Sequence, residues 1–246
     1  MSLALKLALS PVLLAQALVT RRRMPRLPEP TGQRSGVAGA LHGAPLSLLV
    51  AGDSSALGLG VHTQRDALAG PLAQQLAQAC QARVNWRLVA RAGLTTSQTL
   101  HLLLREASPH ADVAVVVSGV NDVVDQVPSH QAVSAREALA NSLRNAHAVQ
   151  HVVFAPLPPI HHFPGLPQPL RWVAGADAHR HNAALQRWAA TRGDVSCVEM
   201  QMPLDPNMMA VDGFHPGEAV YRYCAHAIAQ HIATLVWPQL QLRGSE

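Results

Sequence analysis

The sequence DVAVVVSG at residues 112–119 is the clearest β-strand signal in the chain, because its centre consists mostly of β-branched residues. Similar short apolar runs occur at 46–52, 84–90, 151–156 and 194–200, and helical patterns separate them. Five strands that alternate with helices predict an α/β fold. We expect a flavodoxin-like, three-layer α/β/α sandwich around a five-stranded parallel sheet.

The apolar periodicity between these strands predicts the helices. They are expected at 66–82, 95–107, 134–149, 179–192 and from about 218 to 236. Pro71 is expected to disturb the first turns of its helix. Ser134 and Glu137 have the spacing of a capping box, which predicts that their helix begins at Ser134.

Composition limits the class of protein. The chain has 246 residues, of which 48% are hydrophobic and 14% charged, so it is too apolar for a disordered chain. The apolar runs are too short and too interrupted for a multi-span membrane protein. The three cysteines lie at wide spacings that match no disulfide framework and no zinc cluster, which indicates reduced thiols and a reducing compartment. A cytoplasmic location is therefore expected, with membrane association and export left open.

Positive charge is concentrated near the N-terminus. Residues 1–43 contain six basic residues and one acidic residue, a net charge of +5. The remaining 203 residues contain 13 arginines and 14 acidic residues, a net charge of −1. The main body of the chain therefore lacks the basic surplus that holds a phosphate backbone, and we expect no nucleic-acid partner.

Residues 1–43 are predicted to form an apolar and basic helix followed by a linker, ahead of a domain at 44–246. Residues 3–19 are mostly apolar and precede the basic sequence TRRRMPR, while residues 25–43 contain the Pro and Gly typical of a linker. On a helical wheel the polar side contains Ser2, Lys6, Ser10, Gln16, Thr20 and Arg23. Residues 3–23 therefore fit peripheral contact with a membrane or packing on the domain. The sequence Ala-Gln-Ala at 15–17 also resembles a signal-peptide cleavage site.

Small and polar residues follow three of the predicted strands. Ser54 lies after the first strand, Gly93 after the second and Asn121 after the third, and a further polar group, Asp212 to His215, precedes the last helix. Each group alone is equally compatible with a turn or a helix cap. Parallel sheets bind ligands at the carboxyl ends of their strands, so the fold is expected to bring these groups together.

The chemistry of these residues is that of nucleophilic catalysis. A serine hydroxyl needs a base that accepts its proton, and His215 is the candidate base for Ser54. Asp212 lies three residues before His215 and can fix its tautomer. The backbone N–H groups of Ser54 and Gly93, with the side-chain amide of Asn121, are candidate donors to an oxyanion.

These groups resemble the four sequence blocks of the GDSL, or SGNH, hydrolases. The sequences GDSS at 52–55, GVND at 119–122 and DGFHP at 212–216, together with Gly93, occur in the order of that family. The resemblance covers residues 46–237 and implies the SGNH hydrolase fold, with Ser54, Asp212 and His215 as triad and Ser54, Gly93 and Asn121 as oxyanion donors. It implies hydrolysis of acyl esters or thioesters through an acyl-serine, with no metal and no cofactor. Ser55 stands where the family name has Leu.

The substrate is less well defined by the sequence. The Pro-rich segment 156–172 is expected either to pack on the sheet as a loop or to line an acyl pocket through Phe163, Leu166, Leu170 and Trp172. A membrane-lying N-terminal helix favours a lipid ester such as a lysophospholipid, whereas a packed helix fits a soluble ester or thioester equally well. Transfer of the acyl group to another acceptor, and a catalytically silent membrane-associated binding protein, are the alternatives. The sequence leaves the oligomeric state open.

Overall fold

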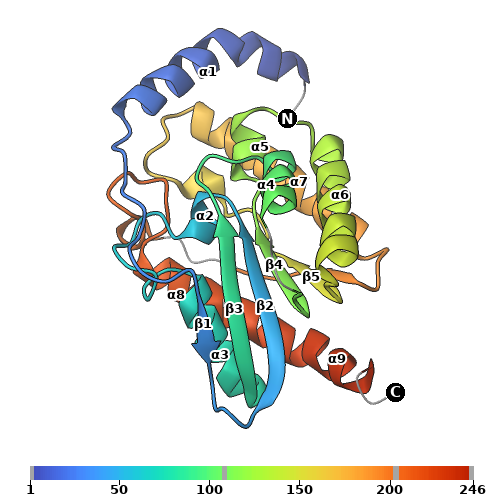
Figure 1. The fold of residues 1–246 in the computed structure, drawn as a ribbon. Coiled ribbons are helices and arrows are strands. Elements are labelled where there is room, and N and C mark those ends of the chain that lie inside the picture. The colour runs from blue at the N-terminus through green and yellow to red at the C-terminus, as the bar shows by residue number, and fades with distance from the viewer. Residues whose placement is uncertain (1–2, 107–109, 202–204, 244–246) are drawn as a thin grey trace.

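The computed structural model describes residues 3–106, 110–201 and 205–243 and has the three-layer α/β/α architecture that the sequence predicts (Figure 1). Its sheet has the strand order β1-β3-β2-β4-β5-β6. The strands are β1 (Ser35–Ala38), β2 (Ala44–Gly52), β3 (Ala82–Ala90), β4 (Val113–Val117), β5 (His151–Phe154) and β6 (Val195–Cys197). Strands β2 to β6 are parallel, which confirms the predicted five-stranded parallel sheet.

Strand β1 is an addition to the predicted sheet. It pairs antiparallel with β3, with Ser35 opposite Arg87 and Ala38 opposite Val84. The sheet therefore has six strands, and the extra strand lies in the segment 25–43 that was expected to be a linker. The division of the chain at residues 43 and 44 stays a prediction.

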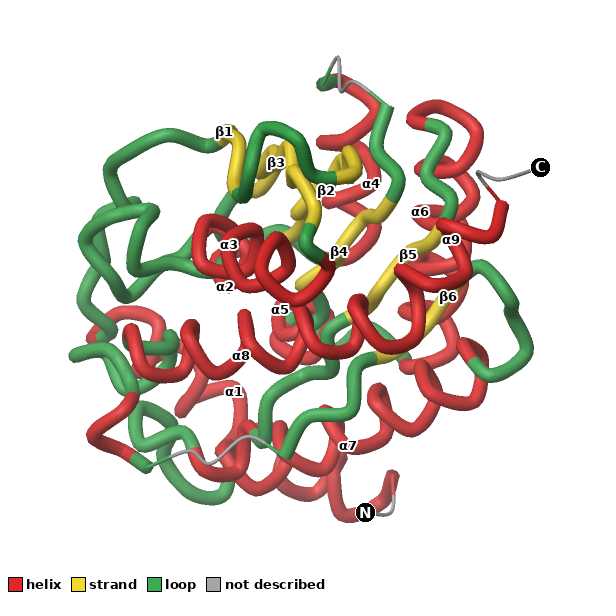
Figure 2. Tube along the Cα trace, turned by 90° about the horizontal axis from the view of Figure 1, so that it is seen from below, coloured by secondary structure: helices red, strands yellow, loops and turns green. Residues whose placement is uncertain are grey.

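Helices cover both faces of the sheet, so that the strands run between them (Figure 2). The helices are α1 (Leu3–Arg23), α2 (Ser54–Leu57), α3 (Ala69–Cys80), α4 (Thr96–Arg105), α5 (Val120–Val124), α6 (Ser129–His147), α7 (Leu170–Ala189), α8 (Glu218–His231) and α9 (Trp237–Arg243). A π-helical segment, Ile232–Val236, joins α8 to α9, and short 3-10 turns occur at Ile160–His162 and Pro206–Met208.

The alternation of β2 shows how the layers form. Leu46, Leu48 and Val50 are buried in the core shared with α3 and α8. Leu49 and Ala51 are buried on the opposite face, in the core shared with α4, α6 and α7. Because successive side chains of a strand point to opposite faces, this apolar run needs a helical layer on each side.

Two helices begin earlier than the sequence patterns predict. Helix α6 begins at Ser129, after Pro128, so the predicted capping box at Ser134 is wrong. The Ser134 hydroxyl instead donates to the His130 carbonyl inside the helix. Helix α7 begins at Leu170, after Pro169, rather than at residue 179. Pro71 lies in the first turn of α3, where its missing N–H leaves no helical hydrogen bond unmade.

Helix α1 lies across one end of the molecule, apart from the main layers (Figure 1). It contacts the domain chiefly through α7. No helix in the described part of the chain is both long enough and apolar enough to cross a membrane.

Candidate active site

The turn after β2 places Ser54 at the carboxyl end of the sheet. The backbone N–H of Asp53 donates to the Val117 carbonyl of the neighbouring strand at 3.1 Å. Gly52 has φ +153°, and a Cβ at this position would collide with the same carbonyl. The Asp53 carboxylate accepts a hydrogen bond from the Ser55 N–H at 2.9 Å and so caps α2, which begins with Ser54. Asp53 thus holds the turn in place and supplies the N-cap of α2.

Ser54, His215 and Asp212 form one continuous chain of hydrogen-bonding groups. The Ser54 Oγ and His215 Nε2 atoms are 3.1 Å apart, and His215 Nδ1 is 2.6 Å from Asp212 Oδ2. Ser54 lies 161 residues from His215 in sequence, so the fold alone brings them together.

The turn from Asp212 to His215 holds the acid and the imidazole in register. Asp212 Oδ1 accepts hydrogen bonds from the N–H groups of Phe214 at 3.0 Å and His215 at 2.9 Å. Burial alone would raise the pKa of Asp212, but the hydrogen bonds from His215 and from these N–H groups outweigh it and hold the pKa below its usual value. Asp212 therefore stays ionised at neutral pH, where it can stabilise a protonated imidazole.

Asn121 connects the other two blocks to the serine turn. Its side-chain amide donates to the Leu94 carbonyl at 3.0 Å and to Asp53 Oδ2 at 3.3 Å. The first contact joins Asn121 to the residue after Gly93, and the second joins it to the residue before Ser54. The structure thus brings together all three positions predicted to donate to an oxyanion.

A buried carboxylate pair supports this arrangement, and sequence reasoning did not identify its contacts. Asp122 Oδ2 accepts from the backbone N–H of Thr96 at 3.1 Å and from its hydroxyl at 2.7 Å, which holds α5 against the start of α4. Asp53 is fully buried, and this desolvation, together with the nearby Asp122 carboxylate, raises its pKa to about 7 despite the opposing Ser55 hydrogen bond. Long-range pairs of this kind leave no local signal in the sequence.

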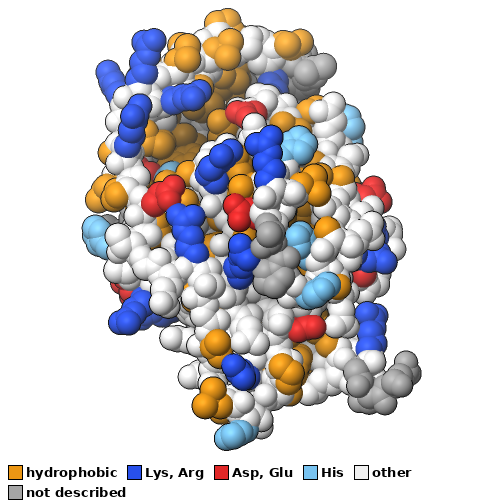
Figure 3. Space-filling model, viewed as in Figure 1, with side chains coloured by type: hydrophobic (Ala, Val, Ile, Leu, Met, Phe, Trp, Pro, Cys, Tyr) orange, Lys and Arg blue, Asp and Glu red, His pale blue; other side chains and the backbone are white. Residues whose placement is uncertain are grey.

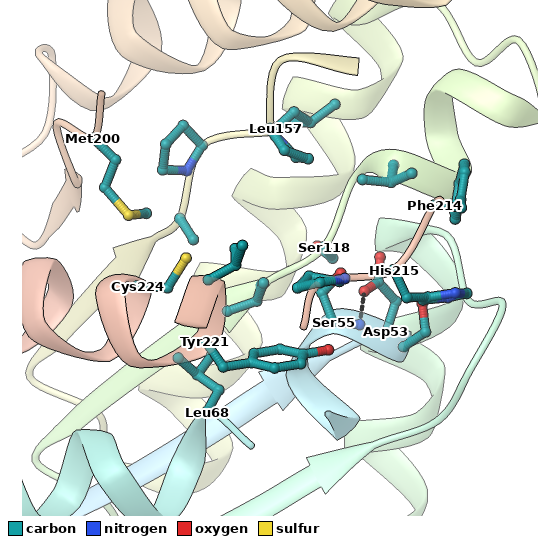
Figure 4. A pocket seen from close by; sticks show the side chains of 18 of the residues that line it. Asp53, Ser55, Leu68, Ser118, Leu157, Met200, Phe214, His215, Tyr221 and Cys224 are labelled. Atoms are coloured by element: carbon teal, nitrogen blue, oxygen red, sulfur yellow. Dashed lines mark hydrogen bonds between the residues drawn. The ribbon is translucent and has the colours of Figure 1, made fainter. Parts of the chain in front are cut away.

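Ser54 and His215 both line an apolar pocket, and His215 lies at one end of it (Figure 4). Met200 and Cys224 lie at the other end, while Leu157 and Tyr221 flank the space between. The cavity volume is about 60 Å³. Burial raises the pKa of the Cys224 thiol to about 12, so this wall of the pocket is uncharged.

The four residues predicted to line an acyl pocket occupy different places. Phe163 lines the pocket that contains Ser54, and its ring packs edge-on against Phe214 at a centroid distance of 5.3 Å. Leu166 lines a separate groove beside Asp212. Leu170 packs against the small core around Phe163. Trp172 lies on α7 at a hollow lined by His161, His162 and His179, and not at the Ser54 pocket.

Among the residues that the structure describes, no three His, Cys, Asp or Glu side chains form a group able to hold a metal ion. All three cysteines are free thiols.

The fold and the four blocks define an α/β hydrolase architecture, and comparison with known proteins defines the family. The model of the GDSL-like lipase/acylhydrolase family matches residues 50–223, which include Ser54, Gly93, Asn121, Asp212 and His215. The chain belongs to this family, and as a member it is a carboxylic ester hydrolase. No curated protein matches the sequence significantly.

Solved structures of similar architecture are distant in sequence. The lipase Lip_vut3 from a goat rumen metagenome has a TM-score of 0.61 at 16% identity, covering 77% of this chain and 97% of that one. Axe2, an acetylxylan esterase from Geobacillus stearothermophilus, has a TM-score of 0.58 at 15% identity, covering 79% and 97%. TesA has a TM-score of 0.56 at 22% identity, covering 76% and 97%. At these identities the likeness concerns the fold.

Proposed function

We propose that the protein hydrolyses carboxylic esters through an acyl-Ser54 intermediate. The observation that carries this proposal is the hydrogen-bonded chain from Ser54 through His215 to Asp212, with Ser54 and His215 lining an apolar pocket. Ser54 Oγ attacks the ester carbonyl carbon while His215 Nε2 takes the hydroxyl proton. The tetrahedral intermediate then expels the alcohol, which receives that proton from His215.

Water completes the cycle by the same route. A water molecule attacks the acyl carbon while His215 takes one of its protons, and collapse of the second intermediate releases the carboxylic acid and returns the proton to Ser54 Oγ. Asp212 keeps its negative charge throughout and stabilises the imidazolium that forms in each step.

The oxyanion of each intermediate is held by the N–H groups of Ser54 and Gly93 and by the Asn121 amide. In the structure both amide hydrogens of Asn121 already have acceptors. Binding an oxyanion therefore requires one of these bonds to be replaced. We expect the bond to Asp53 to give way, since at 3.3 Å it is longer than the 3.0 Å bond to Leu94.

The dimensions of the pocket favour a short acyl group. A cavity that holds one water has a volume of about 10–15 Å³ by the same measure, so the 60 Å³ pocket accommodates roughly four to six such units. An acetyl or butyryl group fits this space, with Phe163 as part of its wall. The longer chain of a lysophospholipid would have to lie along the groove beside Leu166 and Asp212.

Hydrolysis of a series of p-nitrophenyl esters of increasing acyl length tests both parts of the proposal. We expect kcat/KM to be greatest for short chains and to be lost in Ser54→Ala, whereas Ser55→Ala keeps activity. Full activity of Ser54→Ala would contradict the acyl-serine mechanism. A preference for long chains would contradict the assignment of the acyl pocket and leave the mechanism intact.

Changing the end of the pocket that Cys224 lines tests the assignment of the acyl pocket further. Cys224→Phe fills that end, so we expect kcat/KM for the butyrate ester to fall about tenfold or more relative to the acetate ester. The matched variant Cys224→Ala enlarges the same end and should shift the preference toward longer chains. An unchanged acyl preference in both variants would show that the acyl group binds elsewhere.

A further inference from the structure

Helix α1 has an unusual orientation, because polar side chains from it face the domain. Lys6 Nζ lies 2.7 Å from Asp177 Oδ2 on α7. The Gln16 side chain donates to the Gln168 carbonyl at 2.6 Å and accepts from the Leu170 N–H at 3.1 Å. These three contacts hold the helix through polar side chains, which would otherwise face water.

The outward side of α1 is apolar. Leu7, Leu14 and Leu18 are exposed by 63%, 65% and 58%. Their spacing of seven and four residues places them on one helical face. Soluble proteins rarely leave several large apolar side chains together on an exposed face without a partner. In the space-filling view, hydrophobic side chains line the top of the molecule along this helix (Figure 3).

Positive charge lies at the C-terminal end of the same helix. Arg21, Arg22, Arg23 and Arg26 are exposed, and none of them forms an ion pair within the described chain. Lys and Arg side chains gather at this end in the space-filling view (Figure 3). Exposed leucines next to arginines without an ion pair suit contact with an anionic lipid interface, where the apolar side chains are buried and the arginines meet the head groups.

Helix α1 and Asp212, the proposed acid of the catalytic site, line the same groove. A groove of about 570 Å³ lies between α1 and the segments 164–167 and 211–212. Gln16, Val19 and Arg23 form its helical wall, and Asp212 lies on the opposite wall. Helix α1 therefore lies beside the segment that carries Asp212.

We propose that the exposed face of α1 docks the enzyme on an anionic phospholipid bilayer, with Leu7, Leu14 and Leu18 entering the interface and the arginines contacting the head groups. This places the groove beside Asp212 at the lipid surface, so that esters held in the bilayer reach the site; that last step rests on the proposed ester hydrolysis. A second copy of the chain is the less suitable occupant, since residues 1–43 carry a net charge of +5 and repel each other.

Vesicle co-sedimentation tests the docking, with Ser54→Ala as background so that binding is measured without turnover. The vesicles contain equal parts of phosphatidylcholine and phosphatidylglycerol, or phosphatidylcholine alone. We expect binding to the anionic vesicles that weakens with salt, and a loss of about tenfold or more in Leu7→Gln/Leu14→Gln/Leu18→Gln. The matched control Leu41→Gln/Leu104→Gln/Leu242→Gln removes three leucines exposed by 72%, 60% and 72% elsewhere and should bind normally.

A second variant and a second measurement make the result decisive. Arg21→Ser/Arg22→Ser keeps the leucines and should lower binding to anionic vesicles only. With Ser54 restored, the α1 leucine variant should hydrolyse soluble p-nitrophenyl acetate at the wild-type rate, so a failure of docking is distinguishable from a failure of catalysis. Absence of vesicle binding, or equal binding by the leucine variant, would overturn the proposal. A dimer that the leucine variant converts to monomer, without vesicle binding, would assign this face to a second copy instead.

Discussion

In the described part of the chain, histidine rings contact a serine hydroxyl in two clusters, and these clusters differ in their surroundings. Ser54 Oγ lies 3.1 Å from His215 Nε2 at the end of β2. Ser196 Oγ on β6 lies 2.9 Å from His151 Nε2 and 2.8 Å from His231 Nε2. Distance alone would rank the second cluster higher.

The second cluster lacks the group that a triad needs behind its base. His215 contacts the ionised Asp212, whereas among the described residues neither His151 nor His231 hydrogen-bonds a carboxylate. Burial, with a contribution from His231, lowers the pKa of His151 to about 4, and burial also lowers the pKa of His231. A proton taken from Ser196 would therefore be held poorly.

Position in the sheet distinguishes the clusters too. Ser54 follows the carboxyl end of a central strand and opens into a pocket, as expected for a parallel sheet. His151 begins β5, and Ser196 lies within the edge strand β6. The clusters therefore differ in the buried acid behind the histidine and in the place of the serine in the sheet, and we expect only Ser54 and His215 to act as nucleophile and base.

Replacing one histidine of each cluster by alanine, in two separate variants, should give the largest difference in activity between the clusters. His215→Ala should lower kcat/KM by on the order of 10⁴–10⁶, since the serine loses its base. His231→Ala should leave kcat/KM unchanged and lower only the free energy of unfolding, by about 1 kcal/mol for the lost hydrogen bond. Steady-state hydrolysis of p-nitrophenyl acetate measures both. Equal losses in the two variants would remove the distinction between the clusters.

The Asn121 amide should have the next largest effect, because in the proposed mechanism it donates a hydrogen bond to the oxyanion in the transition state. Asn121→Ala should lower kcat by about 10²–10³ with little change in KM, the result expected when a bond forms only in the transition state. Asn141→Ala, which changes an exposed asparagine on α6, serves as the control and should retain full activity. A rise in KM with unchanged kcat would instead assign Asn121 to substrate binding.

Asp53 should have the smallest effect, and on stability rather than on rate. Its pKa of about 7 in the folded protein exceeds the value of 3.8 expected in the unfolded chain. The folded state thus keeps a proton that the unfolded state has lost, and this group makes stability fall as pH rises from about 4 to 7. Asp53→Asn cannot titrate, so its free energy of unfolding should rise relative to wild type by about 1 kcal/mol per pH unit between pH 5 and 7.

Urea unfolding at both pH values measures this difference, and Asp194→Asn provides the control. The hydrogen bond from Arg192 holds the pKa of Asp194 at about 2, so its contribution is complete above the unfolded value and is lost only in more acidic solution. The control difference should therefore stay constant between pH 5 and 7. A constant difference for Asp53→Asn as well would show that its carboxyl group is not buried as described.

Much of the fold could be predicted because its signals are local. The β-branched centre of β4 and the apolar run of β2 each carry their own pattern. Strand β1 could not be predicted, since SGVA at 35–38 is four residues long, contains Gly36, and becomes a strand only by pairing with β3. The early starts of α6 and α7 follow Pro128 and Pro169, and proline next to a helix start is a signal that the sequence did offer.

The candidate site also has parts that could be predicted from the sequence and parts that could not. Its four blocks were recognisable because each keeps its spacing within a few residues. The contacts between Asn121 and Asp53, and between Thr96 and Asp122, join segments 68 and 26 residues apart and could not be inferred locally. For α1, the helical wheel defined the two faces, but the tether from Lys6 to Asp177 across 171 residues decides which face is outward.

Fluorophosphonate labelling followed by peptide mapping tests the central claim most directly, because the reagent forms a stable adduct only with an activated serine. We predict a single adduct on Ser54, retained in Ser55→Ala and absent in His215→Ala, with Ser196 unmodified. An adduct on Ser55 or Ser196, or no adduct on the folded wild-type protein, would contradict the account.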